Sequence, residues 1–575
     1  MNPLRVILAI LATSPVMTLA AATIQHAWWK EAVVYQVYPR SFKDSNGDGI
    51  GDLKGITSKL DYIQRLGVNV IWLSPHYDSP NADNGYDIRD YRKVMADFGT
   101  MADFDGLLQG IKQRNMKLIL DLVVNHSSDE HAWFAASRKS KDNPYRDYYF
   151  WRPAKDGREP NNWVSFFSGS AWTLDPATNE YYLHLFAAKQ PDLNWDNPKV
   201  RRAVYDLMKF WLDKGVDGFR MDVIPFISKR AGLPDLPPDY MTRPQYFYAM
   251  GPRLHEYLRE MNREVLSKYD AMTVGEAFGV TLEQTPSLVD ERRHELNMIF
   301  NFDVVRLNRD GEQWRDWTLP EMKAIYTTED KALDVHSWNT VFLSNHDNPR
   351  VVSAFGDDSP AFRILSAKLL ATMLLTLKGT PFIYQGDELG MTNYPFTRIE
   401  EFDDIQVKNG WKADVLTGKM KADPYLANLR KTSRDNSRTP MQWDNSSNAG
   451  FTTAATPWLR VNPNYKDINA ARELADPSSI YNYFCKMVEF RKKTPALVYG
   501  AYEDLDPRNA HVFVYTRTLG TDKYLVVLNF SKDNISFTLP GGLTAGELQI
   551  SNLASQEAKT HALNLKAWEA RVYRQ

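Results

Sequence analysis

The chain has 575 residues, of which 43% are hydrophobic and 24% charged, so it is long enough for more than one domain and has the composition of a soluble globular protein. That composition excludes a disordered chain, a coiled coil and a collagen-like protein. With 69 Lys and Arg against 71 Asp and Glu, the net charge is −2. This balance gives no bulk electrostatic reason to bind nucleic acid or an anionic membrane.

The first 22 residues have the pattern of a secretory signal. Arg5 is the only charge in this stretch, an apolar run follows from Val6 to Ala12, and small residues precede a cleavage point near Ala22. An anchor helix is the alternative, but Pro15 interrupts the run and leaves it too short to span comfortably. A single cysteine, Cys485, excludes an internal disulfide. We therefore expect export to a bacterial periplasm or to the exterior.

Eight short apolar runs rich in β-branched residues recur along the chain. Longer amphipathic patterns, such as residues 56–66 and 200–214, lie between them. Near-continuous apolar runs are typical of parallel strands buried on both faces, and eight strand–helix units predict a (β/α)8 barrel, the TIM-barrel fold of the α/β class. The predicted strands cover residues 33–38, 68–73, 118–124, 216–222, 272–276, 298–302, 340–344 and 380–384.

Two segments depart from this repeat. Residues 127–197 are rich in Trp, Tyr, Asn and Pro and are too long for one helix, so they predict a small inserted domain B. Near the C-terminus, strand-like runs are separated by turn residues without helices, which predicts an antiparallel β domain. The resulting boundaries are a barrel over 23–126 and 198–496 and a C-terminal β-sandwich over 497–575, with strands at 511–515, 524–528 and 536–539.

Polar residues collect where the predicted barrel strands end, and these ends line the active site in barrels of this kind. A single such residue is more often part of a buried salt bridge, but three carboxylates, one Arg and two His from four strand ends predict catalysis. A zinc site is the alternative, although the spacing matches no zinc motif. The residues are Asn125 and His126, Arg220 and Asp222, Glu276, and Asn345, His346 and Asp347.

This set of side chains suits the cleavage of a glycosidic bond. Two carboxyl groups can flank the bond, one acting as nucleophile and the other as acid and then base. Arg220 lies two residues before Asp222 on the same strand face and is expected to keep that carboxyl ionised. A glutamate in an aromatic-walled pocket is suited to acid work by a raised pKa. The third carboxylate can stabilise the charged transition state.

A second polar cluster, residues 44–52, follows the start of an EF-hand loop. Asp and Asn stand at alternate positions and glycine at the sixth, but Gly55 occupies the place where an EF-hand has Glu. A polar turn without an ion is the alternative. We expect a structural Ca²⁺, or Mg²⁺ in its place, and no organic cofactor. The expected ligands are Asp44, Asn46, Asp48, Ile50 and Asp52.

These motifs in this order resemble the α-amylase superfamily, glycoside hydrolase family 13. The resemblance rests on residues 121–126, 218–222 and 345–347 together with Glu276, and it extends from about residue 31 to the C-terminus. It implies that Asp222 is the nucleophile, Glu276 the acid/base and Asp347 the transition-state stabiliser.

The resemblance also implies how glucose is bound. Asp83 and Tyr86 match a glucose-recognising pair, and Arg438 matches the arginine that closes the pocket against Asp83 and so rejects long chains. Further implied contacts to substrate are His126, Phe167, Phe186, Gln190, Arg220 and His346.

Within the superfamily, residues 190–194 resemble the oligo-1,6-glucosidase subfamily, which also contains trehalulose and isomaltulose synthases. Phe278 and Phe302 match the aromatic clamp described in sucrose isomerases, with ordinary packing as the alternative. Arg306 and Arg309 stand in a stretch that matches a charged loop of isomaltulose synthases, with Asn308 in place of its central Asp.

The resemblance therefore implies a sucrose isomerase that yields isomaltulose or trehalulose. From the sequence itself we expect a monomer, because no exposed apolar stripe stands out, and the balanced charge predicts no nucleic-acid or membrane partner. An oligo-1,6-glucosidase or sucrose hydrolase, a transferase such as trehalose synthase, and a transporter subunit are the alternatives.

Overall fold

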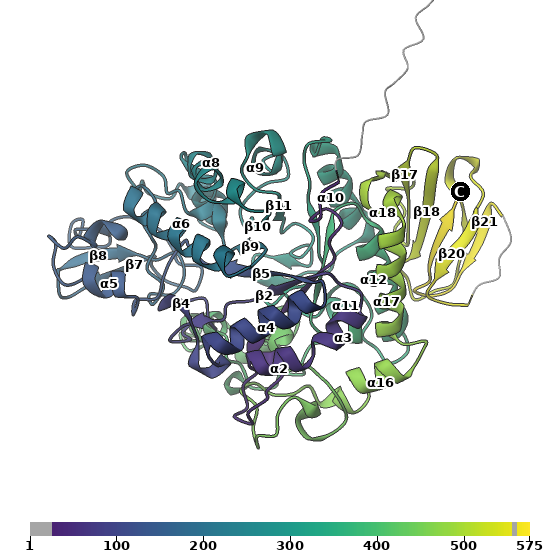
Figure 1. The fold of residues 1–575 in the computed structure, drawn as a ribbon, viewed down its shortest axis with the longest axis horizontal. Helices are drawn as coiled ribbons and strands as arrows, with labels where there is room; N and C mark the ends of the chain where they lie inside the picture. Colours follow the sequence, from purple (N-terminus) through teal and green to yellow (C-terminus); the bar gives the residue numbers. More distant parts are fainter. Residues whose placement is uncertain (1–25, 555–559) are drawn as a thin grey trace, which may run out of the picture.

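The computed structural model describes residues 26–554 and 560–575. The signal expected at residues 1–22 lies outside the described residues. Figure 1 shows a central barrel, with the inserted domain at one end of the long axis and the C-terminal β domain at the other.

The barrel contains eight parallel strands in the order β11-β10-β9-β5-β2-β1-β15-β14, which confirms all eight predicted strands. Thr340 donates a hydrogen bond of 2.9 Å from Oγ1 to the carbonyl of Ile299, and this contact brings the two outer strands of the sheet together. The barrel is therefore nearly closed. The strands are β1 (Val34–Val37), β2 (Val70–Leu73), β5 (Lys117–Leu122), β9 (Gly218–Met221), β10 (Met272–Glu276), β11 (Met298–Phe300), β14 (Thr340–Val341) and β15 (Thr380–Tyr384).

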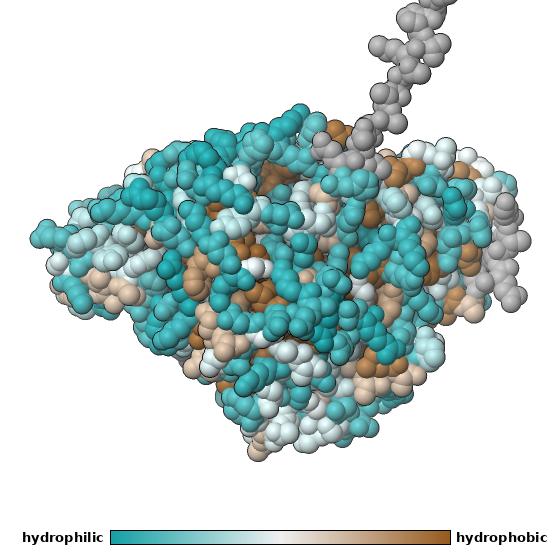
Figure 2. All heavy atoms as spheres, in the orientation of Figure 1, coloured by the Kyte–Doolittle hydropathy of each residue, from teal (hydrophilic) through white to brown (hydrophobic). Residues whose placement is uncertain are grey.

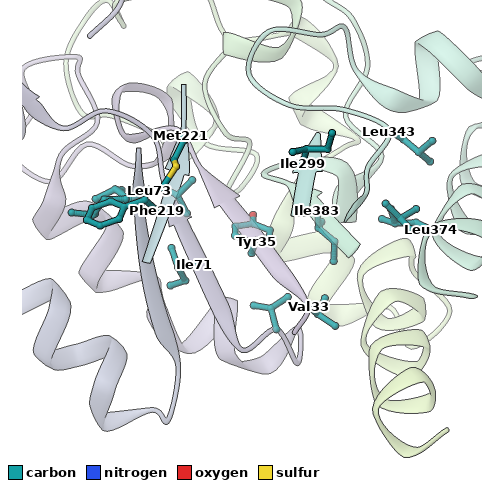
Figure 3. Close-up of a cluster of buried hydrophobic side chains, with 14 of the residues drawn as sticks. Val33, Tyr35, Ile71, Leu73, Phe219, Met221, Ile299, Leu343, Leu374 and Ile383 are labelled. Carbon is teal, nitrogen blue, oxygen red and sulfur yellow. The ribbon is translucent and has the colours of Figure 1, made fainter. Parts of the chain in front are cut away.

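Alternate residues of these strands fill two separate cores. Val34, Trp72 and Phe300 point into the barrel, where the rings of Trp72 and Phe300 stack at 5.5 Å. Their neighbours in sequence, such as Val33 and Ile71, belong to a second cluster between the strands and the outer helices, part of which Figure 3 shows. This two-residue alternation explains why the strands read as continuous apolar runs.

Helices follow most strands and cover the barrel (Figure 1). The helix expected over 200–214 is α6 (Pro198–Asp213), and the Asn197 side chain caps it by accepting from the Lys199 N–H. The helix expected over 56–66 is divided at Lys59 into α2 (Leu53–Ser58) and α3 (Leu60–Arg65). The other covering helices are α4 (Met101–Gln113), α8 (Leu254–Glu264), α10 (Leu319–Ala332), α12 (Arg363–Thr376) and α17 (Ile480–Lys493).

The inserted segment after β5 forms a small domain around an antiparallel sheet. Its strands are β6 (Trp151–Arg152), β7 (Trp172–Asp175) and β8 (Glu180–Leu183), in the order β6-β8-β7, and α5 (Ala132–Ser137) precedes them. Buried Trp163 and Leu185 of this domain share one hydrophobic cluster with Phe226 and Tyr248, which follow β9. The domain is therefore packed directly against the mouth of the barrel.

The C-terminal region contains two antiparallel sheets whose facing side chains form one core. The three predicted strands are confirmed as β17, β18 and β19. Lys323 of α10 donates to the carbonyls of Asp506, Asn509 and Val512, which ties this region to the barrel. The sheets are β16 (Ala501–Asp504), β17 (Val512–Leu519), β18 (Asp522–Asn529), β22 (Ala570–Arg574) and β20 (Glu547–Ser551), and β19 (Ile535–Thr538) with β21 (Ala562–Leu565).

A long excursion between β15 and α17 was not anticipated as a separate unit. Residues 397–432, here called the strap, contain α13 (Ile405–Gly410), a single π-helical turn over Trp411–Val415, and α14 (Ala422–Thr432). Phe402, Val407 and Leu429 of the strap form a small hydrophobic cluster with Phe396. A short helix, α15 (Asp435–Arg438), follows.

Within the described residues, no helix has the length and apolarity that a membrane crossing requires. Figure 2 shows a face that is mainly hydrophilic, with hydrophobic residues scattered between polar ones.

Candidate active site

A cavity of about 320 Å³ opens at the carboxyl ends of the barrel strands, between the inserted domain and the strap. Twelve of the sixteen catalytic and substrate-binding residues expected from the sequence line it. They are Asp83, Tyr86, His126, Phe167, Phe186, Asp222, Glu276, Phe278, Phe302, Arg306, Arg309 and Asp347. The other four, Gln190, Arg220, His346 and Arg438, are fully buried and contact these lining residues from behind.

Arg220 joins the two central carboxylates. Its Nη1 donates to Asp222 at 2.7 Å, and its Nη2 lies 2.8 Å from Glu276 Oε2. The same Nη1 donates to Asp121 at 2.8 Å. One guanidinium thus brings both carboxyl groups to the floor of the cavity, as the short separation of about 5 Å in retaining glycosidases requires.

Burial controls the charge of this cluster. It raises the pKa of Asp222 well above the usual range, and the Glu276 and Asp121 carboxylates raise it further, while Arg220 lowers it without reversing the shift. Burial likewise raises the pKa of Asp121 to about 6. Arg220 therefore lowers the pKa of Asp222, as expected, but burial and the neighbouring carboxylates raise it by more, because three buried carboxyls share one guanidinium. Burial therefore favours a proton on this group of carboxyls, and general acid catalysis requires a protonated carboxyl.

The backbone after β9 holds Glu276 in place. The N–H of Val223 donates to Glu276 Oε2 at 2.9 Å. Val223 has a φ of 35°, which is unusual for a β-branched residue, so the backbone is strained at the point where it binds the carboxylate. Asp222 and Glu276, the expected nucleophile and acid/base, are thus linked through the residue that follows Asp222.

Asp347 is held in the ionised state. Burial would raise its pKa, but nearby cations hold the pKa well below its usual range. Arg438 Nη2 lies 2.5 Å and Arg434 Nη1 3.5 Å from Asp347 Oδ1. His346 contributes no charge at neutral pH, because burial lowers its pKa to about 3, so Arg434 and Arg438 lower the pKa of Asp347, with a smaller contribution from Arg220. An ionised carboxylate suits the stabilisation of a positively charged transition state.

The arginine that reaches Asp83 is Arg434, so the expectation that Arg438 closes the pocket against Asp83 is wrong. Arg434 Nη2 lies 3.3 Å from Asp83 Oδ1. Arg438 instead donates from Nε to the His346 carbonyl at 3.0 Å and pairs with Asp347. The two arginines are four residues apart, so the sequence does not reveal which one faces Asp83.

Gln190 of the inserted domain and a stacked pair of rings support the cavity from behind. Gln190 Nε2 donates to Asp83 at 3.1 Å and lies 3.2 Å from His126 Nε2. Tyr86 stacks on His346 with the ring centroids 5.2 Å apart, and its hydroxyl lies 2.6 Å from His346 Nε2. These contacts hold Asp83, Tyr86 and His126 in place at this end of the cavity.

Aromatic rings form the other side of the cavity. Phe278 and Phe302 lie 5.3 Å apart at an interplanar angle of 49°, and the Arg306 guanidinium lies 5.6 Å from the Phe278 ring. Phe166, which sequence reasoning missed, lies 5.5 Å from Phe278. The only sequence signal for it was its position beside Phe167 in the aromatic inserted segment.

The two arginines of the 306–310 stretch differ in their partners. Arg306 donates to Glu312 at 2.8 Å. The guanidinium of Arg309 makes no hydrogen bond to any described residue, and Glu312 lies 3.9 Å away. Burial lowers the pKa of Arg309 to about 10, so it remains charged at neutral pH. Both side chains line the cavity next to the aromatic pair.

In the 44–52 loop, the side chains of Asp44 and Asp52 are buried, whereas Asn46 and Asp48 are exposed. Asp44 accepts from the N–H groups of Asn46, Gly47 and Gly49, and Thr452 donates to the same carboxylate. Oxygen donors of this kind fit a hard divalent cation. However, no group of three or more His, Cys, Asp or Glu side chains among the described residues is arranged to hold a metal. The ion therefore stays a prediction.

Comparison with known proteins agrees with this geometry. The family model described as the α-amylase catalytic domain matches residues 36–500. The chain belongs to the α-amylase family. A second model, for the C-terminal domain of the α-amylase SusG, matches residues 512–572.

The relatives of this chain include both glucosidases and sugar synthases. An oligo-1,6-glucosidase from Parageobacillus thermoglucosidasius is 54% identical over 561 residues, which is 96% of this chain and 99% of that protein. An isomaltulose synthase variant from Erwinia rhapontici, solved with D-glucose, is 54% identical with a TM-score of 0.95, over 96% of this chain and 100% of that one. The trehalulose synthase from Pseudomonas mesoacidophila is 54% identical with a TM-score of 0.94 and the same coverage. The chain is thus an enzyme of the glycosidase and transglycosylase type.

Proposed function

We propose that this α-amylase family enzyme isomerises sucrose. It transfers the glucosyl group from the original fructose oxygen to another hydroxyl of the same fructose, forming isomaltulose through O6 or trehalulose through O1. The observation that carries the proposal is the Phe278–Phe302 pair at 5.3 Å, with Arg306 over the Phe278 ring. This aromatic wall is continuous with the lining of the catalytic cavity, where a released sugar must wait.

The first step breaks the glycosidic bond. Sucrose binds with its glucose towards Asp83 and Tyr86. Glu276 protonates the glycosidic oxygen while Asp222 attacks the anomeric carbon, and a glucosyl ester on Asp222 results. Asp347, ionised between its two arginines, lies where it can stabilise the positive charge that develops on the sugar.

The second step depends on what attacks the ester. Fructose stays against Phe278 and Phe302, turns, and presents a new hydroxyl, which Glu276 deprotonates as the bond to the anomeric carbon forms. Two inversions retain the α configuration. Water at the same position gives glucose and fructose instead. Aromatic rings that cover the cavity favour fructose because they bind a sugar face and exclude water.

An oligo-1,6-glucosidase, or a sucrose hydrolase, is the second candidate. It is favoured by the names of the curated relatives, which include oligo-1,6-glucosidases at 54% and 52% identity over 96% of this chain. Asn308 also favours the hydrolase, because it replaces the central Asp of the loop that the resemblance associates with isomerases. In this alternative Phe278 and Phe302 are packing residues, and water takes every glucosyl group.

Product analysis distinguishes the two candidates. Purified enzyme is incubated with sucrose and, separately, with isomaltose, and the products are resolved by chromatography. Mostly isomaltulose or trehalulose from sucrose supports the isomerase. Mostly glucose and fructose, or much faster cleavage of isomaltose than of sucrose, supports the hydrolase. Asp222→Asn serves as the control without a nucleophile and should abolish both reactions.

A further inference from the structure

Arg434 is shared by three carboxylates, and the shortest contacts are to a residue outside the catalytic motifs. Asp404 accepts from Arg434 Nε at 2.8 Å and from Nη2 at 2.6 Å. The contacts of Arg434 to Asp83 and Asp347 are longer, at 3.3 and 3.5 Å. Charge-assisted hydrogen bonds are strongest at about 2.7–2.9 Å, and a two-pronged pair also fixes direction. Asp404 therefore decides where the guanidinium rests.

Asp404 is itself fixed by the strap. It is the N-cap of α13, where Oδ1 accepts from the Gln406 N–H at 2.8 Å. Its own N–H donates to Asp435 Oδ2 at 3.1 Å. The side chain is 1% exposed, and although burial would raise its pKa, Arg434 lowers it, so Asp404 is ionised at neutral pH. The Asp404 carboxylate, buried at the N-terminus of α13, is thus a rigid partner for the long side chain of Arg434.

The placement of Arg434 matters for both halves of the site. Beside Asp83 it closes the glucose end of the cavity, and beside Asp347 it helps to keep that carboxylate ionised. A guanidinium without Asp404 would move fully onto one of these two carboxylates. Either move changes sugar binding, because both carboxylates line the cavity.

We propose that Asp404 is a positioning residue that holds Arg434 between Asp83 and Asp347 and thereby couples the strap to closure of the glucose end of the cavity. The inference concerns the glucosyl-binding half of the site, which the isomerase and the hydrolase share. It goes beyond the proposed function and does not depend on it.

The test is a double-mutant cycle on the full-length enzyme. Asp404→Asn, Arg434→Gln and the double variant are compared by kcat and KM for p-nitrophenyl α-glucoside, a substrate that reports glucosyl transfer in either candidate function. Asparagine keeps the shape and the N-cap of α13 but removes the charge. We expect Asp404→Asn to lower kcat/KM by about 10- to 100-fold, mainly through KM, and to add almost nothing in the Arg434→Gln background.

Asp403→Asn is the matched control. The side chain of the neighbouring Asp403 is 42% exposed and pairs with Lys408 at 2.7 Å, away from Arg434. This variant should retain wild-type kinetics. Asp404→Ser, which also keeps the cap, replaces Asp404→Asn in the cycle if the latter does not fold. Wild-type kinetics in the Asp404 variants, or effects of the two single changes that multiply in the double variant, would overturn the proposal.

Discussion

One buried histidine ring without hydrogen-bond partners among the described residues should make the folded enzyme less stable in acid. His76 follows β2 and is completely buried, its ring is stacked on Phe104 at 5.0 Å, and neither ring nitrogen has a partner among the described residues. Burial lowers its pKa to about 3 from 6.5. The unfolded chain therefore binds a proton below about pH 6.5 that the fold does not accept until about pH 3.

The sign of the effect follows from this difference. Because the pKa of a base is lower in the fold, protonation favours the unfolded chain, and stability is lost as the pH falls below 6.5. One unit of pKa corresponds to about 1.4 kcal/mol, so at about pH 5 His76 costs about 2 kcal/mol of the free energy of unfolding relative to neutral pH. His76→Phe should remove this loss.

This acid-induced loss of stability is measured by urea unfolding of the wild type and of His76→Phe at about pH 7 and about pH 5. A change in packing alters the free energy of unfolding by the same amount at both pH values. The difference between the two pH values therefore isolates the effect of protonating His76. His511→Gln is the control, since His511 is exposed. An equal acid-induced loss of stability in the wild type and in His76→Phe would refute the reasoning.

Three further predictions concern stability, product and metal. Glu329 is buried, and burial raises its pKa to about 8, so stability should fall as the pH rises from about 4.5 to about 8; Glu329→Gln should flatten that slope in urea unfolding, and an unchanged slope would contradict the assignment. Phe302→Leu should increase the ratio of glucose to isomerised product from sucrose severalfold, because a smaller side chain covers less of the cavity; an unchanged ratio would mean that Phe302 only packs. We propose that Ca²⁺ binds the 44–52 loop. A chelator should then lower the melting temperature, added Ca²⁺ should restore it, and Asp48→Asn should abolish the response. A melting temperature that neither addition changes would exclude the ion.

The sequence by itself determined the barrel and predicted which three carboxylates gather at its mouth. Apolar β-branched runs specify strands locally, and eight such runs with helical patterns between them predict a parallel barrel. Because the carboxyl ends of such strands meet at one mouth, the positions of Asp222, Glu276 and Asp347 along the chain already predicted that they would converge. The three C-terminal strands were found for the same reason, since each is a continuous apolar run.

The tertiary structure alone decided how the side chains pair around those carboxylates. Arg434 and Arg438 are four residues apart on one short segment, and only the fold shows that the first reaches Asp83 and the second Asp347. Asp404 lies thirty residues before Arg434 on a strap with no strand signal, so nothing local predicted their contact. The sequence likewise did not reveal that the pKa of Asp222 is raised. This shift depends on burial beside Glu276 and Asp121, which lie on two other strands. Such pairings are long-range consequences of packing, and a periodic pattern in the sequence does not encode them.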